Sequence, residues 1–317
     1  MYQLIRDLLF RLDAENAHEL TVEQIMRLQQ IPVVLRAIAW MCEPEAKPVS
    51  LLGMTFRNRI GIAAGFDKNA TMMPFLAALG FGFIEVGTVT LYPQPGNPKP
   101  RMFRYPSHGA IINRMGFNND GAAAVAERLK GWDRRVPTLV NVGKNRDVPL
   151  DAAAEAYGEC ARILGPYADA VVVNLSSPNT PSLRDLQRPE HLEKILDAVG
   201  PALVKIAPDV DEAMIGEICD VCSRRAMGMI CTNTTIERPF TTNEAGGLSG
   251  RPLLLRSTEV LASVRKHVGP DFPLIGVGGV FTPSDVLAKR EAGADLVQVY
   301  TGFIYEGPSL PRRLAEA

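Results

Sequence analysis

The segment A170-V-V-V-N-L-S-S-P-N179 runs from four apolar residues directly into a polar stretch. A short apolar run bounded by turn-forming residues is typical of a strand buried on both faces, as the strands of a parallel sheet are. The polar residues that follow then lie at the carboxyl end of that strand. The segment therefore predicts a buried parallel strand whose end presents asparagine and serine side chains.

Seven further short apolar runs repeat this pattern along the chain, and stretches with helical spacing alternate with them, as at residues 122–132, 150–165 and 284–294. Eight strand–helix units in series predict an α/β fold, a (β/α)8 TIM barrel. A doubly wound sheet would need a glycine-rich phosphate turn after an early strand, and neither GxGxxG nor GxxxxGK[ST] occurs. The seven runs are residues 60–64, 83–86, 138–142, 202–206, 228–232, 274–277 and 296–300.

Residues 1–42 differ from the rest of the chain, because their apolar residues follow the spacing of short amphipathic helices. Such helices either pack on the main domain or form a surface that meets lipid or an apolar ligand. We expect residues 1–42 to form a separate helical segment and residues 43–317 to form the barrel. A second departure is the stretch 88–119, whose prolines and glycines predict a long functional loop.

Composition excludes several classes of protein. The formal net charge of −1 gives no electrostatic footprint for nucleic acid, and no apolar run is long enough to cross a bilayer. Five scattered cysteines indicate a reducing compartment. Cys219 and Cys222 form a CxxC pair, but it lies in a stretch with helical spacing and lacks a second ligand pair, so we interpret it as structural. No cluster has the spacing of metal ligands, so we expect no metal.

The predicted strand ends are rich in Asn, Thr, Ser and Lys, and in a TIM barrel the reacting groups lie at these ends. Asparagine amides suit a flat heterocycle with alternating C=O and N–H groups, and a lysine beside them suits a carboxylate. The glycines of residues 276–279 and 300–303 predict a phosphate site at the last two strands. With Lys205 inside a strand, they favour a bound flavin mononucleotide, although a buried ion pair also explains Lys205.

The order of the motifs along nearly the whole chain resembles the dihydroorotate dehydrogenases, specifically their quinone-dependent, membrane-associated class. The motifs include A64-G-F-D-K68, N113-R-M-G-F-N-N119, V140-N-V-G-K-N145, N174-L-S-S-P-N-T-P-S-L-R184, V204-K-I-A-P-D209 and G246-G-L-S-G-R-P-L253. The resemblance implies FMN as cofactor, oxidation of (S)-dihydroorotate to orotate in pyrimidine biosynthesis, and a membrane quinone as electron acceptor. It also implies that residues 1–42 form a membrane- and quinone-access segment, and that the protein is a monomer in peripheral contact with the cytoplasmic face of a bacterial membrane.

The resemblance also assigns roles to individual residues. Ser177 matches the catalytic base, Thr180 is a candidate proton relay, and His18 and Arg104 match positions near the quinone. The expected substrate contacts are Lys68, Asn113, Arg114, Met115, Gly116, Phe117, Asn174, Asn179, Asn233 and Thr234. The expected FMN contacts are Ala64, Gly65, Phe66, Asp67, Lys68, Thr88, Asn141, Asn174, Lys205, Thr232, Gly250, Gly279, Tyr300 and Thr301.

Ser177 separates this class from the soluble one, which is similar but carries cysteine at the base position and lacks the N-terminal helices. A loop hydroxyl that bonds its own backbone before Pro178 is the plainer explanation of the serine. Three other functions stay open at this point: a soluble dihydroorotate dehydrogenase using fumarate or NAD, another FMN barrel such as a tRNA-dihydrouridine oxidoreductase, and a non-catalytic nucleotide-binding barrel.

Overall fold

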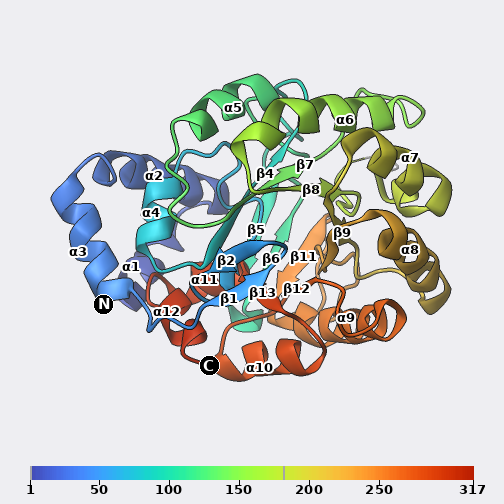
Figure 1. The fold of residues 1–317 in the computed structure, drawn as a ribbon. Coiled ribbons are helices and arrows are strands. Elements are labelled where there is room, and N and C mark those ends of the chain that lie inside the picture. The colour runs from blue at the N-terminus through green and yellow to red at the C-terminus, as the bar shows by residue number, and fades with distance from the viewer. Residues whose placement is uncertain (1, 181–182) are drawn as a thin grey trace.

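The computed structural model describes residues 2–180 and 183–317, and its centre is a closed barrel of eight parallel strands (Figure 1). This confirms the barrel predicted from the eight apolar runs. Neighbouring strands pair in parallel register around the ring, and β13 closes it against β3. The barrel strands are β3 (Ile60–Ile62), β4 (Phe83–Val89), β7 (Thr138–Val142), β8 (Ala170–Asn174), β9 (Leu203–Ile206), β10 (Gly228–Cys231), β12 (Leu274–Val277) and β13 (Leu296–Val299).

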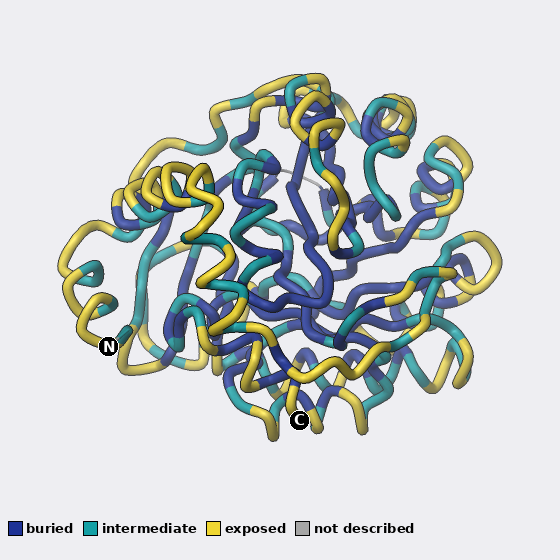
Figure 2. Tube along the Cα trace, turned by 60° about the vertical axis from the view of Figure 1, so that its left-hand side comes forward, coloured by how far each residue is buried: buried dark blue, intermediate teal, exposed yellow. Residues whose placement is uncertain are grey.

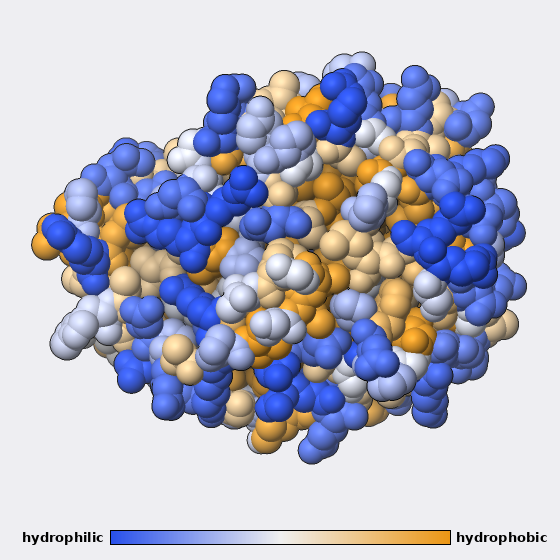
Figure 3. Space-filling view, in the orientation of Figure 1, coloured by the Kyte–Doolittle hydropathy of each residue, from blue (hydrophilic) through white to orange (hydrophobic). Residues whose placement is uncertain are grey.

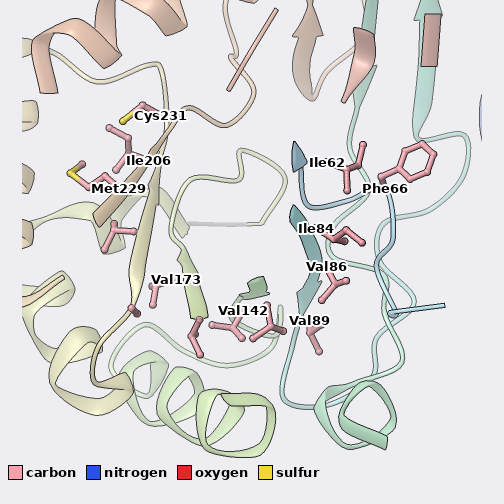
Figure 4. Packing of buried hydrophobic residues seen from close by; sticks show 14 of the residues in the cluster. Ile62, Phe66, Ile84, Val86, Val89, Val142, Val173, Ile206, Met229 and Cys231 are labelled. Carbon is pink, nitrogen blue, oxygen red and sulfur yellow. The ribbon is translucent and has the colours of Figure 1, made fainter. Parts of the chain in front are cut away.

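Side chains alternate between the inside and the outside of the barrel along every strand, because successive residues of a strand point to opposite faces. The outward residues form the large core between strands and helices, in which Figure 4 labels Val86, Val142, Ile206 and others. The inward residues form a separate apolar cluster inside the barrel, which includes Phe83 and Leu139. Both faces are thus buried, which is why the strands are nearly continuous apolar runs.

Helices cover the outside of the barrel, and the tube in Figure 2 shows buried strands surrounded by helices that are exposed on one side. Several of these helices end at glycine, as α7 does at Gly200 with φ +82°, a conformation that favours glycine. The helices are α4 (Met73–Ala78), α5 (Ala122–Lys130), α6 (Ala153–Leu164), α7 (Pro189–Val199), α8 (Glu212–Arg225), α9 (Leu254–Val268), α10 (Pro283–Glu291), α11 (Thr301–Glu306) and α12 (Leu310–Ala315).

The stretch 88–119 is not simply a loop, and here the prediction was wrong. It contains the hairpin of β5 (Met102–Tyr105) and β6 (Ala110–Asn113), and β6 also pairs with β11 (Gly247–Gly250) in an antiparallel sheet of three strands. Pairing with a strand from a distant part of the chain supplies hydrogen-bond partners to backbone N–H and C=O groups in this proline- and glycine-containing stretch. A shorter antiparallel hairpin pairs β1 (Val49–Leu51) with β2 (Met54–Phe56).

The first 42 residues form three helices, as predicted: α1 (Tyr2–Leu9), α2 (Ala14–Leu28) and α3 (Pro32–Cys42). They pack on the barrel, as one interpretation expects, and they also expose apolar side chains. Contact of those side chains with lipid or an apolar ligand stays a prediction. Glu15 is buried and forms an ion pair with Arg101 at 2.8 Å, whereas Trp40 is 83% exposed and Leu4 is 77% exposed. Figure 3 shows apolar residues at the left edge, where α3 lies. Among the described residues, no helix is both long and apolar enough to span a membrane.

Candidate active site

A pocket opens at the carboxyl ends of the barrel strands and has an empty volume of about 1030 Å³. Residues from seven of the eight barrel strands or the loops after them line it, together with β6 and β11. Of the predicted site residues, the lining includes Ala64, Gly65, Lys68, Thr88, Asn113, Met115, Gly116, Phe117, Asn174, Ser177, Asn179, Lys205, Thr232, Asn233, Thr234, Gly250, Gly279, Tyr300 and Thr301.

A layer of polar side chains lies inside the barrel directly beneath this pocket, and Glu85 is its centre. The alternation along β4, β7, β9 and β13 turns Glu85, Asn141, Lys205 and Gln298 inward above the apolar cluster. The Glu85 carboxylate accepts bonds from Lys205 Nζ and Gln298 Nε2, both at 2.9 Å, from Asn141 Nδ2 at 2.6 Å and from the Ala64 N–H at 3.1 Å.

Lys205 therefore lines the pocket and also belongs to a buried ion pair. A role toward a bound ligand and a buried ion pair are thus compatible for this residue. Its side chain is 5% exposed, and that of Glu85 is not exposed. A buried carboxylate needs several donors to offset its lost hydration, and here four donors surround it. The result is a fixed ammonium group at the floor of the pocket.

Asn174, at the end of β8, is the centre of a second network in the pocket wall. Its amide donates to Thr88 Oγ1 at 2.9 Å and to Asn141 Oδ1 at 3.1 Å, and its carbonyl accepts from Ser176 Oγ at 2.9 Å. Asn233 Nδ2 in turn donates to Ser176 Oγ at 3.0 Å. Ser176 is fully buried, and its hydroxyl group is hydrogen-bonded within this network. This distinguishes it from the neighbouring Ser177.

Ser177 lies in the pocket lining and is 6% exposed. Its hydroxyl oxygen accepts a bond from the Asn179 N–H at 3.2 Å, which is the local backbone contact expected of a loop serine. That bond leaves the hydroxyl proton and one lone pair available to a neighbour in the pocket. The bond to the Asn179 N–H is therefore compatible with a chemical role for Ser177, and it fixes the position of the Ser177 hydroxyl oxygen.

Arg184 ties the loop that carries both serines to the two following strand ends. Its guanidinium donates to the Ser176 carbonyl at 3.1 Å, to Asp209 Oδ2 at 2.7 Å and to the Thr234 carbonyl at 3.0 Å. Asp209 also accepts from the Thr235 hydroxyl. Because the planar guanidinium fixes several partners at once, it holds the loop against the pocket.

Lys68 supplies a second cationic group to the pocket, on the loop after β3. Burial lowers its pKa to about 8, although nearby Glu15 acts in the opposite direction. On the facing wall, Asn179 Nδ2 donates to Asn113 Oδ1 at 3.4 Å. An ammonium group facing paired amides suits a planar ring that carries a carboxylate.

Six predicted site residues do not line this pocket. Asp67 is buried beneath its loop, where burial raises its pKa, and Asn141 lies behind Thr88. Arg114 points away and pairs with Glu244 at 2.6 Å. The other three are His18, which lies on α2, and Phe66 and Arg104, which contact the N-terminal segment.

Phe66 connects those helices to the pocket through aromatic contacts. Its ring meets His18 at 5.9 Å on one side and Tyr300, a lining residue, at 6.1 Å on the other. Burial lowers the pKa of His18 to about 3, and the charge of Lys68 acts in the same direction, so the imidazole is neutral at physiological pH. Arg104 donates to the carbonyls of Leu9 and Leu12 at the end of α1.

Sequence reasoning did not identify several residues of the site. Glu85 is the most consequential, and a charged residue inside the apolar run F83-I-E-V86 was the signal that pointed to it. The others are lining residues: Ala63, Ser249, Leu253, Val277, Val280, Gln298 and Val299.

Comparison with known proteins gives consistent matches over the whole chain. The family model for dihydroorotate dehydrogenase matches residues 47–317. A dihydroorotate dehydrogenase (quinone) from Salinispora arenicola is 48% identical, covering 99% of this chain and 98% of the relative. One from Acidovorax sp. strain JS42 is 46% identical, covering 100% and 97%. The crystal structure of DHODH from Eimeria tenella with ferulenol has a TM-score of 0.87 and 35% identity, covering 98% of this chain and 93% of that one.

Proposed function

The chain belongs to the dihydroorotate dehydrogenase family, and from this we propose that it oxidises (S)-dihydroorotate to orotate with FMN, in pyrimidine biosynthesis, and passes the electrons to a membrane quinone. The observation that carries the proposal is the convergence of two ammonium groups, four asparagines and Ser177 in one pocket at the barrel mouth. These groups match a planar, carboxylate-bearing heterocycle and a flavin together.

The residues present fit a flavin mononucleotide. Gln298 Oε1 is buried without a partner among the described residues, and it suits the ring N–H of an isoalloxazine. Lys205 suits the electron-rich pyrimidine end of the same ring. At the other end of the pocket, Gly278 and Gly279 have φ of +111° and +79°, which turns a glycine loop toward the pocket where barrels bind phosphate.

FMN bound in this pocket would supply the acceptor for the hydride that leaves C6 of dihydroorotate. We assign to Ser177 the removal of the proton from C5, which its fixed oxygen reaches from the loop after β8. A serine hydroxyl is a weak base, so a water or a neighbouring hydroxyl must carry the proton onward. Thr180 remains a candidate for that relay. Lys68 holds the substrate carboxylate, and Asn113, Asn174, Asn179 and Asn233 hold the ring and stabilise charge that develops on it.

The N-terminal helices provide the route for the acceptor in this proposal. A quinone reaches the pocket along Phe66, between neutral His18 and Tyr300, and Arg104 lies at the same helices. The exposed apolar residues of α1 and α3 support a peripheral contact of these helices with a membrane. We propose a monomer at the cytoplasmic face of the bacterial membrane.

Ser177→Ala tests the chemical assignment. The variant is expected to retain its FMN absorbance and to lose about 10²- to 10⁴-fold in the rate of flavin reduction by dihydroorotate, the range for loss of a general base. Stopped-flow absorbance measures this rate without any acceptor. Ser176→Ala is the comparison, because its hydroxyl belongs to the wall network, and its loss should appear mainly as weaker substrate binding. Equal reduction rates in wild type and Ser177→Ala would reject the assignment.

Deletion of residues 1–42 tests the acceptor route, and it should abolish quinone turnover while dihydroorotate still bleaches the flavin. The buried Glu15–Arg101 pair means that deletion also leaves Arg101 without its carboxylate. His18→Leu avoids this and keeps the fold intact. Retained quinone turnover in both variants would argue against the route, and turnover with fumarate or NAD in an acceptor screen would indicate the soluble class.

A further inference from the structure

Lys289, on α10, is a buried cation that the proposed mechanism does not use. It is fully buried, and its ammonium group donates to Ser257 Oγ at 2.6 Å. Among the described residues, no carboxylate lies within ion-pair distance of it. A buried ammonium without a counter-charge is costly, so its presence calls for an anion that binds nearby.

The charged and titratable groups around Lys289 do not provide that anion. The Asp285 carboxylate, on the same helix, accepts instead from the N–H groups of Phe281 and Thr282. Cys231 faces it from β10, but burial raises the pKa of this thiol well above its usual value, so the thiol is neutral. Arg265 on α9 is also cationic and pairs with Asp295 at 3.0 Å.

The ammonium lies directly behind the glycine loop after β12. Ser257 Oγ, which accepts the Lys289 bond, is 3.1 Å from the Gly278 carbonyl oxygen. A Cβ placed on Gly278 would lie 2.7 Å from Ser257 Oγ. A Cβ on Gly276 would lie 3.3 Å from Lys289 Cδ. The other side of this loop lines the pocket through Gly278 and Gly279. One layer of backbone therefore separates the cation from the pocket.

We propose that Lys289 is the buried counter-charge of a phosphate monoester bound at Gly278–Gly279, and that it favours FMN over flavins without a phosphate. The proposal rests on the proposed function only in naming FMN as the phosphate carrier. Lys289 acts across the loop, by electrostatic attraction and by holding Ser257 against Gly278, and is thus a positioning residue.

A protonation change accompanies this role. Burial lowers the pKa of Lys289 to about 7 in the protein without ligand. A bound phosphate favours the charged form and raises this pKa, so FMN binding takes up a proton above neutral pH. FMN affinity is then highest below about pH 7, and it falls as the pH rises toward the pKa that Lys289 has in the FMN complex. Riboflavin, which lacks the phosphate, has no such dependence.

The test compares FMN and riboflavin on the full-length protein by flavin fluorescence, from about pH 6.5 to 9.5. Lys289→Met is expected to weaken FMN about tenfold or more near neutral pH, because a charge pair in partly polar surroundings is worth that much, and to leave riboflavin within about twofold. The control is Lys144→Met, which removes a buried lysine bonded only to carbonyls of the loop after β7. It should shift both flavins equally.

Equal losses of FMN and riboflavin affinity in Lys289→Met would overturn the inference and leave the proposed function standing. If Lys289→Met does not fold, the wild-type pH profile decides: FMN affinity that follows the same profile as riboflavin also overturns it. A wild-type protein that binds neither flavin refutes the proposed function itself.

Discussion

Glu85→Gln is the substitution that tests the energetics of the barrel floor most directly. It keeps the size and shape of the side chain but removes the charge that four donors surround. It also places an amide N–H against the ammonium of Lys205, whose side chain is 5% exposed. Breaking a buried ion pair on one side costs about 3–5 kcal/mol, because the partner stays buried and uncompensated.

The size of the chain converts this cost into a melting temperature. With an unfolding entropy of about 2.1 cal/mol/K per residue, a chain of 317 residues changes its Tm by about 1.5 °C per kcal/mol. Glu85→Gln should therefore lower the Tm by about 5–8 °C. Differential scanning calorimetry at a fixed FMN concentration measures the shift, since bound ligand also moves the Tm.

The double variant Glu85→Gln/Lys205→Met provides the control. Replacing both members of a buried pair by neutral residues is often nearly neutral, so the double variant should recover part of the stability that Glu85→Gln loses. A Tm loss of about 1 °C or less in Glu85→Gln, or a double variant that loses the sum of the two single losses, would refute the reasoning.

Three further predictions concern the pocket and its approaches. The pKa of Lys68 is about 8, and a bound carboxylate raises it, so orotate affinity should be highest below pH 8 and fall above it. Lys68→Met should abolish this pH dependence. Orotate titrations followed by flavin absorbance measure the affinity. Arg184→Met should raise KM for dihydroorotate about tenfold through lost contacts to charged and backbone groups, with FMN affinity unchanged, as steady-state kinetics would show; an unchanged KM would contradict the anchoring role. Trp40→Ser should reduce the fraction of protein that cosediments with vesicles about tenfold. Leu255→Ser, which removes a residue 72% exposed on α9, should leave that fraction unchanged. Equal losses in the two variants would mean that vesicle binding is not specific to the N-terminal helices.

The sequence predicted the barrel well because its strands are buried on both faces and therefore stand out as short apolar runs. The same runs held the evidence for the polar floor, since E85, K205 and Q298 are single polar residues inside them. Only Lys205 was recognised. Its partner Glu85 is 120 positions away, and barrel closure alone brings the two together.

Two other features could not be predicted from local patterns. The hairpin of residues 102–113 depends on pairing with residues 247–250, so its own prolines and glycines predicted a loop. Arg114 stands within the N113-R-M-G-F-N-N119 motif, but the side chain turns to Glu244, a residue 130 positions away. Strand ends therefore predicted which elements form the pocket more reliably than motifs predicted which side chains enter it.

The contacts of the N-terminal helices have a consequence for protein synthesis. Tyr2 donates to the Ile304 carbonyl, Phe10 packs against Tyr305 at 5.3 Å, and Glu15 pairs with Arg101. Tyr2 thus leaves the ribosome 302 residues before its partner Ile304, and Phe10 likewise precedes Tyr305. At about 5–20 residues per second, these helices wait roughly 15–60 s for their full docking site. During that time their apolar faces are open to a chaperone or to the membrane surface, so membrane contact can begin before the barrel exists.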